Sequence, residues 1–293
     1  MQYSVTWQKL KPFGGETMQR RKFMAASLAA SALAAGKSGA ALAATGQAPG
    51  NPGAGQDQSA REYYQLRRYE LRSGPQVKLV NGYFQDAFIP AANRLGIRPV
   101  GVFNVTAGDR SPSLYALIPC PSLETLVHLD ARLGADSEYA KAAAGYLEAP
   151  AAEPAYERME SSLMIAFEGW PKLQTPAATA THGPRAFELR TYESPSDRDH
   201  VRKVEMFNSG EFEVFHHAGF QSVFYGDTLI GSRLPNLTYM LAFDDLASRN
   251  RLWAAFGASP DWKKLSGDAR YAFEEIVSNI TNVILSPAAY SQI

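Results

Sequence analysis

The sequence has little cysteine, no excess of either charge and no long hydrophobic run. Its 293 residues include one cysteine, Cys120, so no internal disulfide can form and stability must come from packing. Basic and acidic residues number 29 each, which gives no basic surface of the kind that binds nucleic acid or anionic membranes. The five histidines are scattered, so residue spacing predicts no metal site. Hydrophobic residues make up 45% of the chain, which is enough to build a proper core.

Signature motifs of several enzyme classes are also missing. The sequence contains no nucleophile elbow, P-loop, dinucleotide fingerprint or zinc motif. Cys120 stands between two prolines, with no neighbour that would lower its pKa. We interpret it as a small residue in a strand-to-helix turn, and the alternatives are a reactive thiol or an intermolecular bridge. These absences leave no complete catalytic constellation.

Residues 1–43 have the features of an export signal. Arg20 and Arg21 precede a weakly apolar, alanine-rich run over residues 25–35, and an A-x-A cleavage site ends at Ala43. The pattern resembles a twin-arginine signal that is cleaved after Ala43. The run is too short and too rich in alanine for a stable membrane span. The alternative is an uncleaved amphipathic tail.

An export signal has consequences for partners and location. We expect the twin-arginine translocase to carry the folded protein, which then becomes periplasmic or secreted. Residues 1–17 lack signal character, so Met18 is a candidate for the true start. Residues 44–60 are rich in Gly, Pro, Ala and Gln and are expected to form a disordered linker.

A seven-residue motif occurs twice, 123 residues apart, and divides the rest of the chain into two halves. Residues 64–70 read YQLRRYE and residues 187–193 read FELRTYE. Further matches at the same offset make chance similarity a poor explanation. We therefore expect two domains joined by a linker that is rich in Pro and Ala. Their bounds are residues 61–170 for the first domain, 171–184 for the linker and 185–293 for the second domain.

Hydrophobic periodicity predicts the same order of elements in both halves: strand, helix, strand, strand, helix, strand. The main expected helices of the first half cover residues 76–95 and 136–147, and a shorter one begins after Ser122. In the second half they cover residues 197–217 and 245–256. The expected strands are residues 62–72, 97–106, 114–118 and 157–167, then 185–193, 221–225, 237–243 and 276–285.

This element order predicts the fold class, which is α+β. Each half would be a ferredoxin-like antiparallel sheet with helices on one face. The other face still carries apolar residues and must be covered. We predict that the two tandem domains pack sheet to sheet within one chain as a pseudo-dimeric α/β barrel. The alternative is pairing of like halves between chains, which would give an obligate homo-oligomer.

The second half resembles the NIPSNAP family. It opens with residues 187–193, has a helix that ends at Gly219 before an aromatic strand, and places Trp262-Lys263 before a last strand ending at residues 285–287. The first half departs from this pattern with Tyr139-Ala140-Lys141. The resemblance implies membership of the dimeric α/β barrel superfamily. That superfamily includes cofactor-free monooxygenases, proteins that bind or degrade haem, and structural modules.

The resemblance implies a fold more closely than an activity. The first hypothesis is an exported NIPSNAP-type protein of undefined activity that binds a small molecule in the barrel and needs no cofactor. The second is a cofactor-free enzyme of the monooxygenase or isomerase kind. The third is a haem-binding protein, for which cytoplasmic folding before export would be the motive.

The repeated motif supplies the candidate ligand-binding residues. Alternate residues of a strand share a face, which places Arg67 with Tyr69, and Arg190 with Glu188 and Tyr192. If this face lines the barrel, it offers a fixed cation and a phenol that could hold a carboxylate or an enolate. The alternative is a structural ion pair between Glu188 and Arg190, or an arginine packed at the domain interface.

Two adjacent histidines, His216 and His217, close the first helix of the second half. A superfamily analogy would make one of them a haem ligand or a general base. Adjacent helical residues point about 100° apart, so the two cannot both face one ligand. We favour helix capping, because the helix dipole stabilises a cationic histidine at this end. His128 and His200 are expected to be solvated.

The export hypothesis makes the first testable prediction. Replacing Arg20 and Arg21 with Lys should hold the protein in the cytoplasm with its signal uncleaved, because the paired arginines identify the export route. Cell fractionation and the mass of the mature chain measure the outcome. Unchanged recovery of the processed double variant from the periplasm would contradict the twin-arginine assignment.

Overall fold

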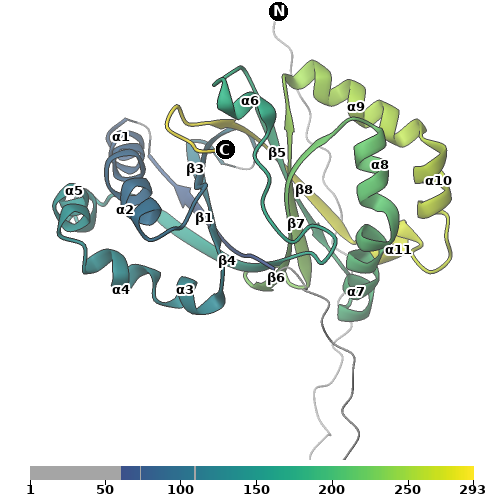
Figure 1. Ribbon diagram of the computed structural model, residues 1–293, viewed down its shortest axis with the longest axis horizontal. Coiled ribbons are helices and arrows are strands. Elements are labelled where there is room, and N and C mark those ends of the chain that lie inside the picture. Colours follow the sequence, from purple (N-terminus) through teal and green to yellow (C-terminus); the bar gives the residue numbers. More distant parts are fainter. Residues whose placement is uncertain (1–60, 73, 109) are drawn as a thin grey trace, which may run out of the picture. The chain divides into compact units, whose positions relative to one another are not determined.

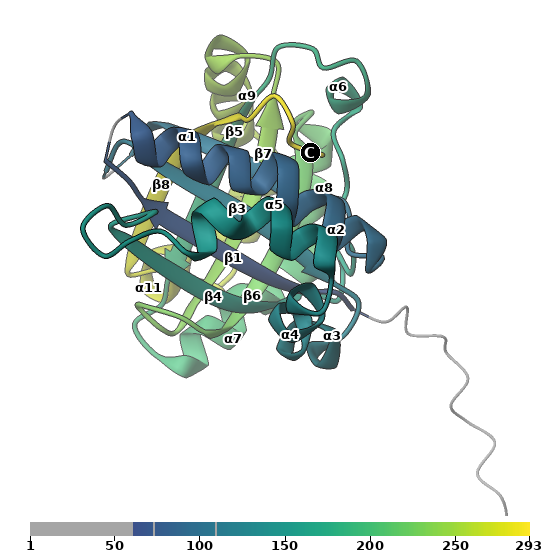
Figure 2. The same cartoon turned by 90° about the vertical axis from the view of Figure 1, so that its left-hand side faces the viewer.

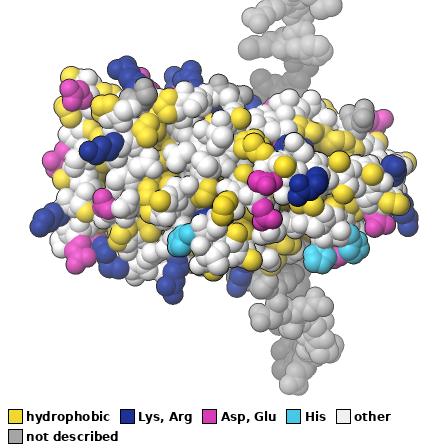
Figure 3. Space-filling model, turned by 90° about the horizontal axis from the view of Figure 1, so that it is seen from above, with side chains coloured by type: hydrophobic (Ala, Val, Ile, Leu, Met, Phe, Trp, Pro, Cys, Tyr) yellow, Lys and Arg dark blue, Asp and Glu magenta, His cyan; other side chains and the backbone are white. Residues whose placement is uncertain are grey.

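The computed structural model describes residues 61–72, 74–108 and 110–293. The expected export signal, with Arg20, Arg21 and the cleavage site after Ala43, lies outside these described residues, as does the 44–60 linker. None of the helices in the described ranges has both the length and the apolar character needed to cross a membrane. On the face seen from above, basic and acidic side chains are interspersed (Figure 3).

Each half contains four strands with its helices gathered on one side. The first half consists of β1 (Tyr63–Glu70), α1 (Pro75–Gly82), the π-helix η1 (Tyr83–Phe88), α2 (Ile89–Arg94), β2 (Gly101–Ala107), β3 (Ser113–Cys120), α3 (Leu123–Val127), α4 (Leu129–Gly134), α5 (Ser137–Leu147) and β4 (Arg158–Ala166). After α6 (Ala177–Ala180), the second half consists of β5 (Ala186–Glu193), α7 (Asp197–Met206), the π-helix η2 (Phe207–Glu211), α8 (Phe212–His217), β6 (Gln221–Ile230), β7 (Asn236–Phe243), α9 (Leu246–Ala258), α10 (Pro260–Ser266), α11 (Phe273–Ile276) and β8 (Asn279–Pro287).

The eight strands close into one antiparallel barrel in the order β1-β3-β2-β8-β5-β7-β6-β4. Two seams join the halves: β2 pairs with β8, where Val105 lies opposite Leu285, and β4 pairs with β6, where Ala166 lies opposite Gly226. The helices of the first half cover one side of the barrel and those of the second half cover the opposite side (Figures 1 and 2). The predicted fold, with two tandem domains packed sheet to sheet, is confirmed.

Alternation along the strands separates three hydrophobic cores. The barrel interior is filled by one cluster, to which the opening strands contribute Tyr64, Leu66, Phe187 and Leu189. Two further clusters lie between each sheet and its own helices. Close packing at the β4–β6 seam depends on Gly226, because a Cβ there would lie 2.9 Å from the Cβ of Met164.

The two long predicted helices are each interrupted by a π-helical turn. In the first half Pro90 lies in the first turn of α2, directly after η1, where its missing N–H leaves the preceding turn to adjust. In the second half the break covers Asn208-Ser209-Gly210, three residues of low helix propensity. The predicted cap at Ser122 is present, because its Oγ accepts a hydrogen bond from the backbone N–H of Thr125 at 3.1 Å.

Several short elements were not predicted. Helices α4 and α11 have no counterpart among the expected elements, and α6 lies inside the stretch interpreted as a linker. Because α11 occupies residues 273–276, the last strand runs over 279–287 rather than 276–285. Cys120 is the last residue of β3 and is fully buried, and burial raises the pKa of its thiol to about 12. It is therefore an unreactive packing residue.

The barrel predicts that neither half is stable as a monomer. Separating residues 61–170 from 184–293 removes both seams and exposes the apolar interior of each sheet, including Tyr64 and Phe187. We expect each fragment alone to aggregate or to form homodimers, and the two fragments to form a heterodimer when they are co-expressed. Light scattering after size exclusion measures the outcome, and a soluble, cooperatively folded monomeric fragment would contradict it.

Candidate functional site

The Arg/Tyr face of β1 lies beneath the helices of the first half. Arg67 donates hydrogen bonds to Gln65 Oε1 at 3.0 Å and to Asp130 Oδ1 at 3.2 Å. Its guanidinium carbon lies 5.4 Å from the centre of the Phe88 ring, which belongs to η1. Tyr69 is fully buried in the cluster between this sheet and its helices. Arg67 and Tyr69 therefore do not line the barrel.

The corresponding face of β5 also lies beneath helices, and its polar groups are paired with one another. Arg190 donates to Glu188 Oε1 at 3.1 Å and to the Tyr192 hydroxyl at 3.0 Å. Tyr239 donates to the same hydroxyl at 2.8 Å. The guanidinium carbon lies 4.3 Å from the centre of the Trp253 ring. This is the structural ion pair that the sequence offered as the alternative.

Glu188 is completely buried and has further partners on α9. Its Oε2 accepts hydrogen bonds from Arg249 Nε at 3.0 Å and from Trp253 Nε1 at 2.7 Å, and its Oε1 pairs with Arg249 Nη2. A buried carboxylate is tolerated when it is saturated in this way. The hypothesis that Glu188, Arg190 and Tyr192 line the barrel is wrong, because their face packs against helices and holds α9 on the sheet.

A second buried ion pair lies nearby and was missed in the sequence. Lys203 on α7 and Glu211 on η2 are both fully buried, and the Lys203 ammonium donates to the Glu211 carboxylate. Burial lowers the pKa of Lys203 and raises that of Glu211, while their mutual attraction opposes both shifts. The ammonium also lies 4.3 Å from the centre of the Phe207 ring. The repeat held the signal, because the first half has Val80 and Phe88 at these positions.

The histidines lie away from the barrel interior. His216 and His217 occupy the exposed last turn of α8, with ring centres 6.1 Å apart, and His217 Nδ1 lies 3.6 Å from Asp261 Oδ2. This position agrees with the capping interpretation. His128 is exposed as expected. The expectation for His200 is wrong, because it is buried against β6, with its Nε2 2.7 Å from Asp227 Oδ1.

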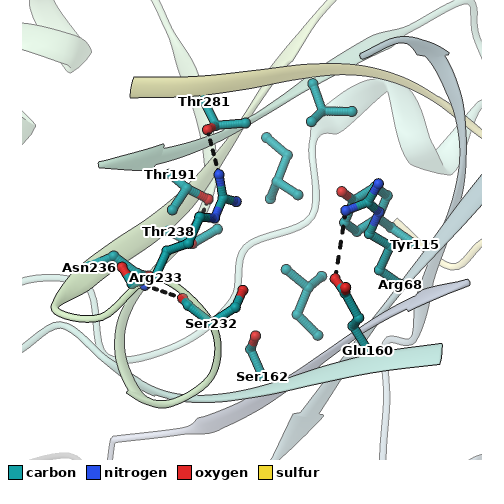
Figure 4. A pocket seen from close by; sticks show the side chains of 13 residues that line it. Arg68, Tyr115, Glu160, Ser162, Thr191, Ser232, Arg233, Asn236, Thr238 and Thr281 are labelled. Atoms are coloured by element: carbon teal, nitrogen blue, oxygen red, sulfur yellow. Dashed lines mark hydrogen bonds and ion pairs between the residues drawn. The ribbon is translucent and has the colours of Figure 1, made fainter. Parts of the chain in front are cut away.

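The barrel interior contains a cavity of about 70 Å³ at the end where β1 and β5 finish (Figure 4). About 10–15 Å³ is enough for one water, so the cavity has room for several waters or a small ligand. Leu66, Leu189 and Val283 give it an apolar part, and exposed Arg233 connects it with solvent. The other lining residues are polar or aromatic: Arg68, Tyr115, Glu160, Ser162, Thr191, Ser232, Asn236, Thr238 and Thr281.

The internal repeat shows that the two halves contribute unequally to this cavity. Leu66 and Leu189 correspond to each other and are identical. Three other lining pairs differ, and in each of them the first half has the larger or charged residue. These pairs are Arg68 with Thr191, Tyr115 with Thr238, and Glu160 with Val283.

Arg68 is the cavity residue with unmet hydrogen-bonding capacity. Its Nε is buried and has no hydrogen-bond partner. Its nearest ion-pair contacts, to Glu70 Oε1 and Glu160 Oε2, are both 3.6 Å, which is too long for a good hydrogen bond. The sequence interpretation chose the neighbouring Arg67 instead, because strand alternation alone does not tell which face enters the barrel.

The buried ion pair gives a stability prediction. Lys203→Val should leave the Glu211 carboxylate unpaired and lower the free energy of unfolding by about 3–5 kcal/mol. The double variant Lys203→Val/Glu211→Phe copies the first half and should recover most of that loss, because it leaves no buried charge. Urea denaturation measures both. A double variant that is less stable than Lys203→Val would contradict this reading.

In the described part of the chain, no group of three or more His, Cys, Asp or Glu side chains is arranged to hold a metal ion. The positions expected for a ligand thus resolve into paired polar groups beneath the helices and a separate cavity inside the barrel. Of the predicted site residues, Arg67, Tyr69, Glu188, Arg190 and Tyr192 belong to the first group.

Comparisons with solved structures support the fold. A protein from Lactobacillus acidophilus NCFM with a provisional monooxygenase assignment has a TM-score of 0.50 at 8% identity, covering 78% of this chain and 94% of that chain. An uncharacterized NIPSNAP-like domain protein from Burkholderia xenovorans is 22% identical, covering 38% of this chain and 90% of its own, with a TM-score of 0.34. A comparison with curated proteins finds no match.

The family comparison covers both halves. The sequence model of the NIPSNAP family matches residues 64–169 and again residues 187–292. These two ranges make up most of the chain and coincide with the two halves of the barrel. The chain therefore belongs to the NIPSNAP family and carries two tandem copies of its domain.

Proposed function

We propose that the protein binds a small molecule in the cavity inside its barrel. The observation that carries this proposal is the difference between the halves at the cavity-lining positions. Thr191 and Val283 in the second half fill the positions that Arg68 and Glu160 occupy in the first half. The fold is thus built with small or apolar side chains at these positions. Charged groups there cost desolvation energy and need another reason, which ligand binding supplies.

The size and chemistry of the cavity fit a small amphipathic ligand. Three aliphatic side chains line one part, while hydroxyl groups and charged groups line the rest. Such a mixture of apolar surface with a few convergent polar groups is typical of small-molecule sites. The volume of about 70 Å³ limits the buried part of the ligand to a few heavy atoms.

The two other functional hypotheses lose the observations that motivated them. The monooxygenase or isomerase hypothesis used the Arg/Tyr face, and the hydroxyl and carboxylate groups on β5 are paired beneath helices. The haem hypothesis used His216 and His217, which lie on the exposed last turn of α8 rather than at the cavity. The structural likeness to a protein with a provisional monooxygenase assignment, at 8% identity, concerns the fold alone.

The proposal includes export by the twin-arginine translocase, which would place the binding function in the periplasm or outside the cell. Its support is the sequence pattern of Arg20, Arg21 and the A-x-A site ending at Ala43. A binding protein with one buried thiol and no disulfide suits this route, because its fold depends on packing and can form before export.

A cavity-filling variant tests the binding function. Thr238→Tyr places the first-half residue in the second half and should fill the cavity with little damage to the barrel. Thermal shift against a library of small organic molecules is the measurement. At a ligand concentration of about 100 Kd, the wild type should gain about 2.7 kcal/mol, or roughly 5–10 °C in Tm, and Thr238→Tyr should gain nothing.

The matched control is Ala254→Tyr, which adds the same side chain on the exposed face of α9. It should respond to ligands like the wild type. Ligands that stabilise Thr238→Tyr as well as the wild type would place binding elsewhere and contradict the proposal. A library without any ligand that stabilises the wild type would also count against it.

A further inference from the structure

We infer that the ligand of the barrel cavity carries a carboxylate group and that Arg68 binds it. This inference rests on the proposed binding function and names its ligand class. It starts from the hydrogen-bonding state of Arg68. A guanidinium offers five N–H donors, and in the residues that the structure describes Arg68 donates no hydrogen bond to protein. Its side chain is 21% exposed, so water from bulk solvent satisfies only part of it.

The two carboxylates near Arg68 have other commitments. Glu70 also pairs with Arg110 through its Oε2. The side chain of Glu160 is 47% exposed and can turn toward solvent. Both lie 3.6 Å from Arg68, so they compensate its charge without satisfying its donors. A small carboxylate in the cavity could make the two parallel hydrogen bonds that match a guanidinium.

Glu160 therefore acts as an internal counter-ion that the ligand displaces. When the cavity is empty, Glu160 limits the cost of an uncompensated arginine. When a carboxylate enters, it takes over the pairing with Arg68, and Glu160 swings outward into water. In Figure 4 Arg68 and Glu160 lie on the same side of the cavity, opposite Thr191, Thr238 and Thr281. The ligand's carboxylate is thereby directed to the wall supplied by the first half.

The opposite wall defines the rest of the ligand. The hydroxyls of Thr191 and Thr238 lie 2.9 Å apart and bond to each other, so they present mainly methyl groups and little hydrogen-bonding capacity. Leu189 and Val283 continue this apolar surface. A short aliphatic body thus fits opposite Arg68. Because the second half has Thr191 and Val283 at the equivalents of Arg68 and Glu160, each chain holds one such site.

Calorimetry with propionate, propionamide and inorganic phosphate, at matched ionic strength, tests the ligand class. Propionate should bind at least ten times more tightly than propionamide, which has the same shape without charge. Arg68→Gln should weaken propionate binding about 10–100-fold, because hydrogen bonds to charged groups are among the strong ones. Glu160→Gln should strengthen propionate binding severalfold, because it removes the competing carboxylate. Arg233→Gln, at the same cavity, is the control and should change propionate affinity by less than the Arg68 variant.

The outcomes separate this inference from the proposed function. Propionamide binding as tightly as propionate, or unchanged propionate affinity in Arg68→Gln, overturns the carboxylate assignment while the small-molecule site stands. Phosphate binding without propionate binding overturns it in favour of another anion. Loss of affinity in Glu160→Gln overturns the displacement step. If neither propionate nor any library compound distinguishes the wild type from Thr238→Tyr, the proposed binding function fails as well. Circular dichroism of each variant confirms that it is folded.

Discussion

The structure depends on the burial of two sheet faces against each other within one chain. A ferredoxin-like half covers one face of its sheet with helices and leaves the other apolar. Here Tyr64 and Leu66 from β1 meet Phe187 and Leu189 from β5 inside a closed barrel, and the β2–β8 and β4–β6 seams satisfy the strand edges. Closure removes every exposed edge and creates the enclosed space that contains the cavity. The site exists only because both halves are present.

Joining the halves in one chain frees them to diverge, and charge has moved to different layers in each. In the first half, Arg68 and Glu160 are inside the barrel, where the second half has Thr191 and Val283. In the second half, Lys203 and Glu211 lie beneath the helices, where the first half has Val80 and Phe88, both fully buried. A barrel assembled from two identical chains would carry the same residues on both sides. The fused barrel can instead present a charged wall opposite an aliphatic one.

The buried polar groups divide into saturated and unsaturated sets, and this division indicates their roles. Glu188 accepts hydrogen bonds from Arg190, Arg249 and Trp253, which ties β5 to α9. Such a network specifies one packing arrangement of helices on a sheet rather than adding much net stability. Arg68 has the opposite character, since its buried Nε has no partner. An unsatisfied buried donor is costly to retain, so it is a stronger sign of function than the larger but complete network.

The sequence by itself determined the architecture, because the 123-residue repeat and the period of two in its strands are local features that survive without knowledge of packing. It did not determine which face of β1 enters the barrel. Both faces are buried, one under helices and one under the opposite sheet, so hydrophobicity does not separate Arg67 from Arg68. The same ambiguity concealed Lys203 with Glu211 and the burial of His200, whose partners lie far along the chain or one π-turn away. Only the closed barrel decides which side chains face each other, because these contacts join strands and helices from distant parts of the chain.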